Sequence, residues 1–120
     1  VEAIKEQVTS FIKEEVANGK TVYVYGASTK GNTLLQYFGL DRTTITAAAE
    51  RNPDKWGKKT VGTLIPIISE EDARAAKPDY FLILPWHFLA EFKTREQEYL
   101  ANGGKFIVPL PKFEIIESAN

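Results

Sequence analysis

The chain has 120 residues, of which 43% are hydrophobic and 26% charged, so it is long enough for one globular domain and too short for two comparable cores. Fifteen basic against 16 acidic side chains give a net charge of −1, which argues against a nucleic-acid backbone or an anionic membrane as the main partner. Without cysteine the chain has no disulfides or thiolate metal ligands, and one histidine is too few for a typical zinc site. No apolar run approaches the roughly 20 residues of a membrane span and no signal-peptide pattern opens the chain, so we expect a cytoplasmic protein.

The first 19 residues predict an amphipathic helix that leads into the domain. Apolar residues recur at helical spacing from Val1 to Val16 with charged residues between them, and Asn18 and Gly19 supply a C-terminal stop. The chain contains no methionine and begins inside this helical pattern. We therefore expect it to be a segment of a longer protein.

The next segment predicts a buried strand, a short loop and a second helix. Residues 21–25 are β-branched or aromatic, as in strands that are buried on both faces of a parallel sheet. Gly26 ends this strand, Ser28 and Thr29 can cap the following helix, and that helix stops at Gly39.

The rest of the chain alternates strands with helices. A polar segment at 51–62 is expected to be a loop, and Pro66 interrupts the strand that follows it, which suits a position at the sheet edge. The predicted strands cover 45–49, 63–68, 80–84, 106–108 and 113–116, and the predicted helices cover a short segment capped by Ser69 and Asp72 and then residues 88–100.

This alternation predicts a three-layer, Rossmann-like α/β fold of the doubly wound type, in which a mainly parallel sheet carries helices on both faces. Because parallel crossovers are right-handed, the strand at 21–25 should lie centrally, between the strands at 45–49 and 80–84. Ligands of such sheets bind where the strand order reverses, beyond the carboxyl ends of the strands. Three segments are expected to converge there, namely residues 26–33, 85–87 and 110–112.

The loop at 26–33 has the composition of a site for a phosphate-bearing ligand. Its glycines allow a tight turn and a close backbone approach, its hydroxyls and the amides at the helix start can donate to phosphate oxygens, and its lysine adds a positive charge. It lacks the Lys-Ser/Thr ending of a P-loop and the full glycine pattern of dinucleotide binders, so a plain strand-to-helix turn is an open alternative. The candidate ligand-binding residues of this loop are Gly26, Ser28, Thr29, Lys30, Gly31 and Asn32.

Glu50 is a further candidate, because it ends the second strand 19 positions after Gly31. Dinucleotide-binding folds place an acid at about this distance, against the ribose hydroxyls. For Glu50 taken alone, we favour a surface pair with Arg51 or Lys55.

Aromatic residues and the histidine complete the candidates. His87 has the chemistry of a general base, but no partner carboxylate or nucleophile is visible, so we favour a role in capping the next helix or packing beside Trp86. Trp86 can stack on a base or sugar at the crevice wall, or it can belong to the core. Trp56 is either an exposed contact or a loop anchor. No residue is assigned a catalytic role.

Several segments form one ordered pattern across nearly the whole chain. They are YGASTKGNTLL at 25–35, RNPDK at 51–55, GK at 57–58, GTLIPI at 62–67, PDY at 78–80, LILPW at 82–86 and GGKFIVP at 103–109. This pattern resembles the C-terminal domain of sugar C-methyltransferases, which use S-adenosylmethionine to methylate a carbon of a nucleotide-linked deoxysugar.

The resemblance implies an intact protein of three parts: a small zinc-binding domain, a methyltransferase domain that holds S-adenosylmethionine, and this Rossmann-like domain at 1–120. The nucleotide-sugar is expected to lie between the last two, and methyl transfer to belong to the middle domain. The chain itself then binds part of the substrate, holds no cofactor and is not catalytic alone. Glu50 stands where the family commonly has Asp, and His87 where Asn is usual, which supports the capping interpretation of His87.

Two other functions stay open on the residues alone. A regulatory Rossmann module would bind a dinucleotide or coenzyme A through Glu50 and the Gly26 loop. A purely structural domain would dock onto a catalytic domain through Trp56 and the leading helix.

Overall fold

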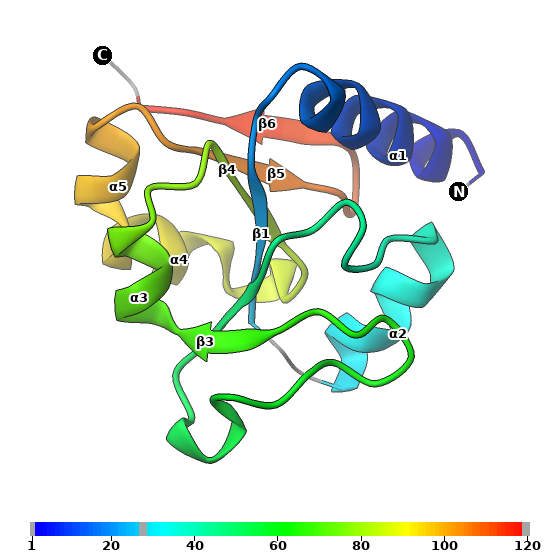
Figure 1. Ribbon diagram of the computed structural model, residues 1–120. Coiled ribbons are helices and arrows are strands. Elements are labelled where there is room, and N and C mark those ends of the chain that lie inside the picture. Colours follow the sequence, from blue (N-terminus) through cyan, green and yellow to red (C-terminus); the bar gives the residue numbers. More distant parts are fainter. Residues whose placement is uncertain (1, 27–28, 119–120) are drawn as a thin grey trace.

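A computed structural model describes residues 2–26 and 29–118, without the side chains of Glu2, Thr29 and Lys30. Within this part of the chain, six strands form one sheet in the order β3-β2-β1-β4-β5-β6 (Figure 1). All neighbouring strands run parallel except β6, which is antiparallel to β5. The strands are β1 (Val22–Tyr25), β2 (Ala48–Glu50), β3 (Ile67–Ser69), β4 (Tyr80–Ile83), β5 (Lys105–Val108) and β6 (Glu114–Ile116).

Helices cover both faces of the sheet, which makes three layers. On one face, α1 and α2 contribute Val8, Ile12, Leu35 and Phe38 to a buried core with the inward side chains of the strands. On the other face, the short helices α3, α4 and α5 contribute Ala73, Phe92 and Leu100 to a second core. The helices are α1 (Glu2–Ala17), α2 (Thr29–Phe38), α3 (Glu70–Ala75), α4 (Leu89–Arg95) and α5 (Gln97–Ala101), with 3₁₀ turns η1 (Pro53–Lys55) and η2 (Trp86–Phe88).

The predicted doubly wound α/β fold is confirmed, including the place of the central strand. β1 pairs with β2 on one side and with β4 on the other, so that Val24 lies between Ala48 and Leu82. All four residues of β1 and all four of β4 are buried, as expected for strands covered by helices on both faces. The strand order therefore reverses at β1, where a ligand crevice was predicted.

Local signals explain where several elements begin and end. Gly19 follows α1 with a φ of +90°, a left-handed conformation that glycine adopts without steric cost. Ser69 caps α3, because its hydroxyl accepts a 2.9 Å hydrogen bond from the Asp72 amide. Across the described residues, the helices found are too short or too polar to cross a bilayer.

Three predicted elements differ from the observed ones. The predicted strand at 63–68 begins only at Ile67, because Leu64 has a φ of +58° and lies in a turn closed by the Thr60 hydroxyl. It is the edge strand, as Pro66 suggested. The strand predicted at 45–49 is shifted to Ala48–Glu50.

The helix predicted at 88–100 is also wrong as a single element. It consists of α4 and α5, separated at Glu96, whose φ of −107° and ψ of 28° lie outside the α-helical region. The break accompanies the burial of the Glu96 side chain, which is 1% exposed. A tertiary interaction therefore overrides the helical pattern.

Candidate functional site

A hollow of about 260 Å³ opens at the carboxyl end of β1, where the strand order reverses. We call it the carboxyl-end hollow. Because β2 lies on one side of β1 and β4 on the other, the ends of these strands and the start of α3 and α4 supply its walls. Its lining residues are Tyr25, Gly26, Glu50, Arg51, Glu70, Phe88, Glu91, Phe92 and Arg95.

Gly26 shapes the exit of β1 into this hollow. Its amide donates a 2.9 Å hydrogen bond to the Ala49 carbonyl, and its φ is +91°. A Cβ atom at this position would lie 3.1 Å from Cγ of Pro85, which follows β4. The ends of β1 and β4 thus approach each other as closely as a residue without a side chain allows.

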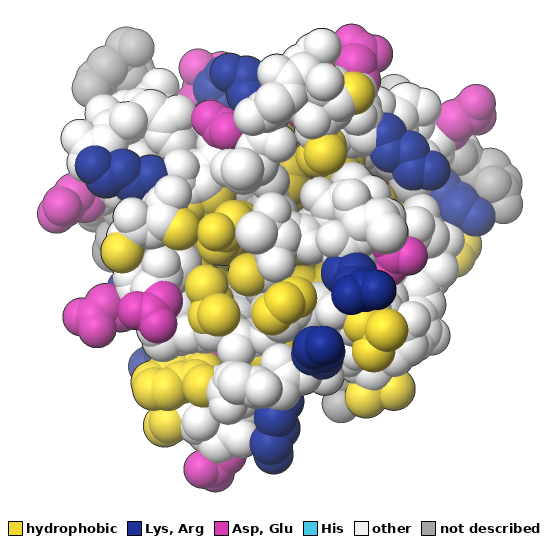
Figure 2. All heavy atoms as spheres, viewed as in Figure 1, with side chains coloured by type: hydrophobic (Ala, Val, Ile, Leu, Met, Phe, Trp, Pro, Cys, Tyr) yellow, Lys and Arg dark blue, Asp and Glu magenta, His cyan; other side chains and the backbone are white. Residues whose placement is uncertain are grey.

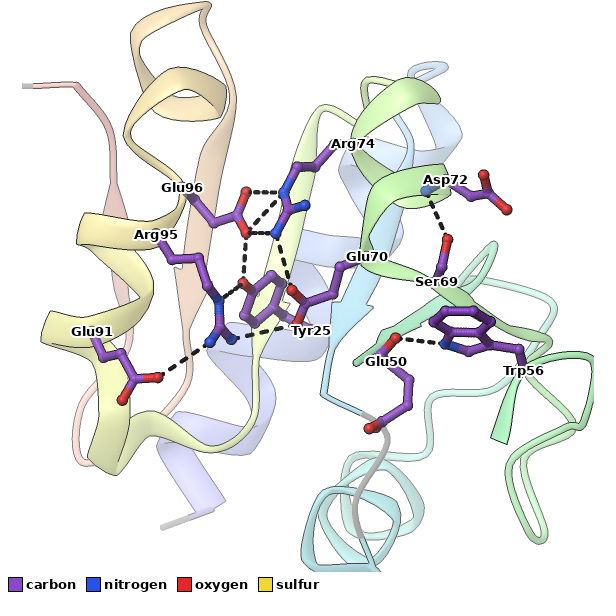
Figure 3. A network of polar contacts seen from close by, with 10 residues as sticks. All are labelled: Tyr25, Glu50, Trp56, Ser69, Glu70, Asp72, Arg74, Glu91, Arg95 and Glu96. Atoms are coloured by element: carbon purple, nitrogen blue, oxygen red, sulfur yellow. Dashed lines mark hydrogen bonds and ion pairs between the residues drawn. The ribbon is translucent and has the colours of Figure 1, made fainter. Parts of the chain in front are cut away.

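A polar network lies beneath the hollow and centres on the buried carboxylate of Glu96 (Figure 3). The Tyr25 hydroxyl donates a 2.6 Å hydrogen bond to Glu96. Arg74 binds both carboxylate oxygens, with Nε 2.8 Å and 3.0 Å away and Nη2 2.7 Å from one of them. Such a two-pronged arginine–carboxylate pair is among the stronger ionic contacts in proteins.

The same network ties α3 to the segment that contains α4. Arg95 donates from Nε to the Tyr25 hydroxyl at 3.0 Å and forms ion pairs with Glu70 at 3.4 Å and Glu91 at 3.2 Å. Arg74 pairs with Glu70 as well as with Glu96. Because Glu70 and Arg74 belong to α3, these contacts form two ionic links across the face of the sheet.

These surroundings shift the ionisation of the network. Burial, followed by the hydrogen bond to Glu96, raises the pKa of the Tyr25 hydroxyl above its ordinary value. The hydrogen bonds to Glu96 likewise raise the pKa of Arg74. Both groups therefore keep their protons at neutral pH, and the Tyr25 hydroxyl stays a donor.

A second hollow, with a volume of about 880 Å³, lies on the other side of this network. Arg74, Arg95 and Glu96 line it from the network side, and Tyr99 lines it near the end of α5. The network thus separates two surface depressions between the helices of one sheet face.

Glu50 and Trp56 secure the end of β2 (Figure 3). The Glu50 carboxylate accepts a 3.0 Å hydrogen bond from the Asn52 amide. The main-chain oxygen of Glu50 accepts a 2.7 Å hydrogen bond from the indole nitrogen of Trp56. Trp56 is still 44% exposed. Its indole therefore anchors the loop after β2, as one of the two sequence interpretations proposed, while part of the ring faces solvent.

Hydrophobic side chains also reach the surface around this loop. Figure 2 shows them across the centre and the lower part of one face, with Lys, Arg, Asp and Glu interspersed around them. The large hydrophobic residues that are most exposed include Trp56, Val61 and Leu64, all from the segment between β2 and β3. Charges of both signs on this face agree with the balanced composition.

The predicted loop at 26–33 is described in part. Gly26 lines the carboxyl-end hollow, and Gly31 is buried within the first turn of α2. Asn32 is half-buried and accepts a 3.3 Å hydrogen bond from the Thr63 hydroxyl. Ser28 lies outside the described residues, as do the side chains of Thr29 and Lys30, so their phosphate contacts stay predictions.

Of the other predicted site residues, Glu50 lines the hollow, whereas Trp86 and His87 are not among its lining residues. Trp86 is half-buried against the second core, and the exposed His87 ring stacks on it with centroids 3.9 Å apart. His87 thus packs beside Trp86, as we favoured. Residues 110–112 are also absent from the lining, because they follow β5 and β4 lies between β5 and β1.

Sequence reasoning missed Phe88, Glu70, Glu91 and Arg95 as lining residues, and it missed Glu96 as the centre of the network. Charged residues on short amphipathic helices resemble solvated surface positions in a sequence. One signal was available, because a tyrosine in a strand buried on both faces needs a partner for its hydroxyl.

Comparison with known proteins gives the family. A family model described as "C-methyltransferase C-terminal domain" matches residues 1–111. The curated protein C-methyltransferase NovU of Streptomyces niveus is 41% identical over 117 residues, which is 98% of this chain and 28% of NovU. The chain therefore spans less than a third of the length of that relative, and it belongs to the C-methyltransferase C-terminal domain family.

Proposed function

We propose that this chain is the substrate-binding C-terminal domain of an S-adenosylmethionine-dependent C-methyltransferase that acts on a nucleotide-linked sugar. The observation that carries the proposal is the position of the carboxyl-end hollow, at the strand-order reversal and with Gly26, the residue directly after β1, in its lining. Doubly wound folds bind nucleotides at this position, with phosphates at the helix N-terminus. Family membership supplies the methyltransferase context.

The size of the hollow supports a share in substrate binding. Pockets that enclose a whole small ligand measure roughly 300–1,000 Å³. At about 260 Å³, the hollow accommodates one part of a nucleotide-sugar and leaves the remainder to another surface. In this proposal a methyltransferase domain of the parent protein supplies that surface, together with S-adenosylmethionine and a zinc site outside this chain.

In this proposal, different residues contact different parts of the ligand. The amides at the start of α2, with Ser28, Thr29 and Lys30, hold the diphosphate, and Gly26 and Gly31 let it approach the backbone. Asn32 supports this turn through its contact with Thr63. Glu50 contributes to the crevice wall, and Trp86 and His87 come directly before Phe88, another lining residue. No residue of the chain is assigned to the methyl transfer itself.

An NMR titration of the 120-residue chain with thymidine diphosphate glucose tests the proposal. We expect amide shifts at residues 26–33 at millimolar ligand, because only part of the binding surface is present. Lys30→Ala should weaken binding about threefold to tenfold through loss of the phosphate charge, whereas Lys13→Ala, on the exposed face of α1, should not.

The absence of any shift at 26–33 at millimolar ligand would refute substrate binding by this loop. Parallel titrations with NAD and coenzyme A address the regulatory alternative. Saturable binding of either one, without a response to the nucleotide-sugar, would favour a regulatory module.

A further inference from the structure

The lining of the carboxyl-end hollow differs in charge and shape from a phosphate site. We propose that the hollow holds an uncharged, hydroxyl-bearing ring of the ligand, either its sugar or its nucleoside, and that the diphosphate lies outside the hollow, toward the start of α2. This inference rests on the proposed function, because it divides the same ligand between two parts of one site.

The charges of the lining disfavour an anion. Three carboxylates line the hollow, from Glu50, Glu70 and Glu91, and two arginines, Arg51 and Arg95. The positive charge of Arg95 is already neutralised, because its guanidinium forms ion pairs with both Glu70 and Glu91. The same group also donates to the Tyr25 hydroxyl. A diphosphate placed here would therefore meet a surplus of negative charge.

Hydroxyl groups suit the same lining. An ionised carboxylate accepts about four hydrogen bonds, and those from a hydroxyl are charge-assisted. Glu50 accepts one from the Asn52 amide at 3.0 Å, which orients the carboxylate at the end of β2. A ring with neighbouring hydroxyls can thus donate to Glu50 at one wall and to Glu91 at the opposite wall.

Phe88 gives the hollow an apolar wall. Its side chain is 57% exposed, among the highest values for the large hydrophobic residues, although it lies at the hollow next to Phe92 with ring centroids 6.4 Å apart. An aromatic face that is left open beside carboxylates matches a ligand with one flat apolar side and a polar edge. Pyranose rings and nucleosides both have this character, and the volume of about 260 Å³ fits one such ring.

Two substitutions test the assignment by the direction of their effect on thymidine diphosphate glucose binding. Glu50→Gln keeps an oxygen for the Asn52 amide but removes the charge. If hydroxyls occupy the hollow, we expect the dissociation constant to rise at least about threefold. If the diphosphate occupied it, the same change would tighten binding. Phe88→Leu should weaken binding about fivefold through loss of the aromatic face.

Matched controls lie on the other face of the sheet. Glu14→Gln removes an exposed carboxylate on α1, and Tyr37→Leu removes a 40% exposed ring near the end of α2. Neither should change the dissociation constant. Equal effects of test and control substitutions would overturn the assignment.

Three fragment probes separate the sources of the ring. Thymidine or methyl glucopyranoside should shift signals of Glu50, Phe88 and Glu91, and the one that does so identifies the nucleoside or the sugar as the occupant. Inorganic pyrophosphate should instead shift residues at the start of α2. Pyrophosphate shifts at Glu50 and Phe88, with none from the two neutral probes, would overturn the inference.

The inference and the proposed function fail in different ways. If thymidine diphosphate glucose shifts residues 26–33 but Glu50→Gln and Phe88→Leu leave its affinity unchanged, only the placement of the ring is wrong. If the nucleotide-sugar causes no shift in the wild-type chain, the proposed function is wrong and the placement falls with it.

Discussion

The hydroxyl of Tyr25 and the carboxylate of Glu96 lie 2.6 Å apart, although 71 positions separate the two residues in the sequence. Tyr25 is the last residue of the central strand and lines the carboxyl-end hollow, while Glu96 marks the break between α4 and α5. Because Glu96 also binds Arg74 of α3, one carboxylate joins the strand to the helices on one face of the sheet. The geometry of the hollow therefore depends on a network beneath it.

Removal of the Tyr25 hydroxyl measures what this contact contributes to stability. Tyr25→Phe keeps the buried ring but leaves Glu96 without one donor and Arg95 without one acceptor. We expect the free energy of unfolding to fall by about 1–3 kcal/mol in urea denaturation, since buried polar groups lose their partners. Tyr37→Phe, at a 40% exposed position, should change it by less than about 0.5 kcal/mol. Equal losses in both variants would contradict a structural role for the Tyr25 hydroxyl.

Substitution of Glu96 should have the larger effect. Glu96→Ala leaves the Arg74 guanidinium without its main partner and opens a cavity, so we expect a loss of about 3–5 kcal/mol. Glu96→Gln retains an oxygen that can accept from Tyr25 or Arg74, so its loss should be smaller. Urea denaturation of both variants checks the order. If Glu96→Ala does not fold, Glu96→Gln alone still shows whether the free energy of unfolding falls. A variant as stable as the wild type would be inconsistent with a stabilising role of the network.

Alkaline pH should destabilise the protein through three tyrosines with raised pKa values. Burial raises the pKa of Tyr25, Tyr80 and Tyr99, and hydrogen bonds to Glu96 and Glu15 add to this for the first two. A raised folded-state pKa contributes stability that is fully present below the unfolded value of about 10 and is lost as the pH rises through the folded value. Urea midpoints should thus hold to about pH 9 and decline above pH 10.

Phenolate absorbance gives an independent check of the same prediction. Tyr25, Tyr80 and Tyr99 should ionise together with unfolding and not before it. If all five tyrosines of the chain ionised in the folded state near pH 10, burial would not perturb these three groups.

The sheet could be predicted from the sequence because its signals are local. The runs at 21–25 and 80–84 consist of β-branched, aromatic and aliphatic residues, and the right-handedness of parallel crossovers leaves few possible strand orders. β1 indeed pairs with β2 and β4. The position of the crevice followed from this order alone.

The chemistry of the crevice walls could not be predicted in the same way. Arg74 and Glu96 are 22 positions apart and both stand among other charged residues, so the sequence gives no sign that they meet at 2.7 Å. Phe88 was assigned to the start of a long helix, but the turn at η2 and the break at Glu96 direct that segment differently. Tertiary contacts decide both features, and such contacts leave no periodic pattern.

Gly26 offers the sharpest test of how the end of β1 is built, because Gly19 has nearly the same φ angle but no neighbouring side chain. Their φ angles are +91° and +90°, but a Cβ at Gly26 would lie 3.1 Å from Pro85, whereas one at Gly19 would meet nothing within 4 Å. Gly19→Ala should therefore cost about 1–2 kcal/mol from left-handed strain alone. Gly26→Ala should cost about 1–3 kcal/mol more from the contact with Pro85, and the effect on the unfolded chain cancels in the comparison. Urea denaturation gives both losses, and equal values would mean that the ends of β1 and β4 do not meet at this position.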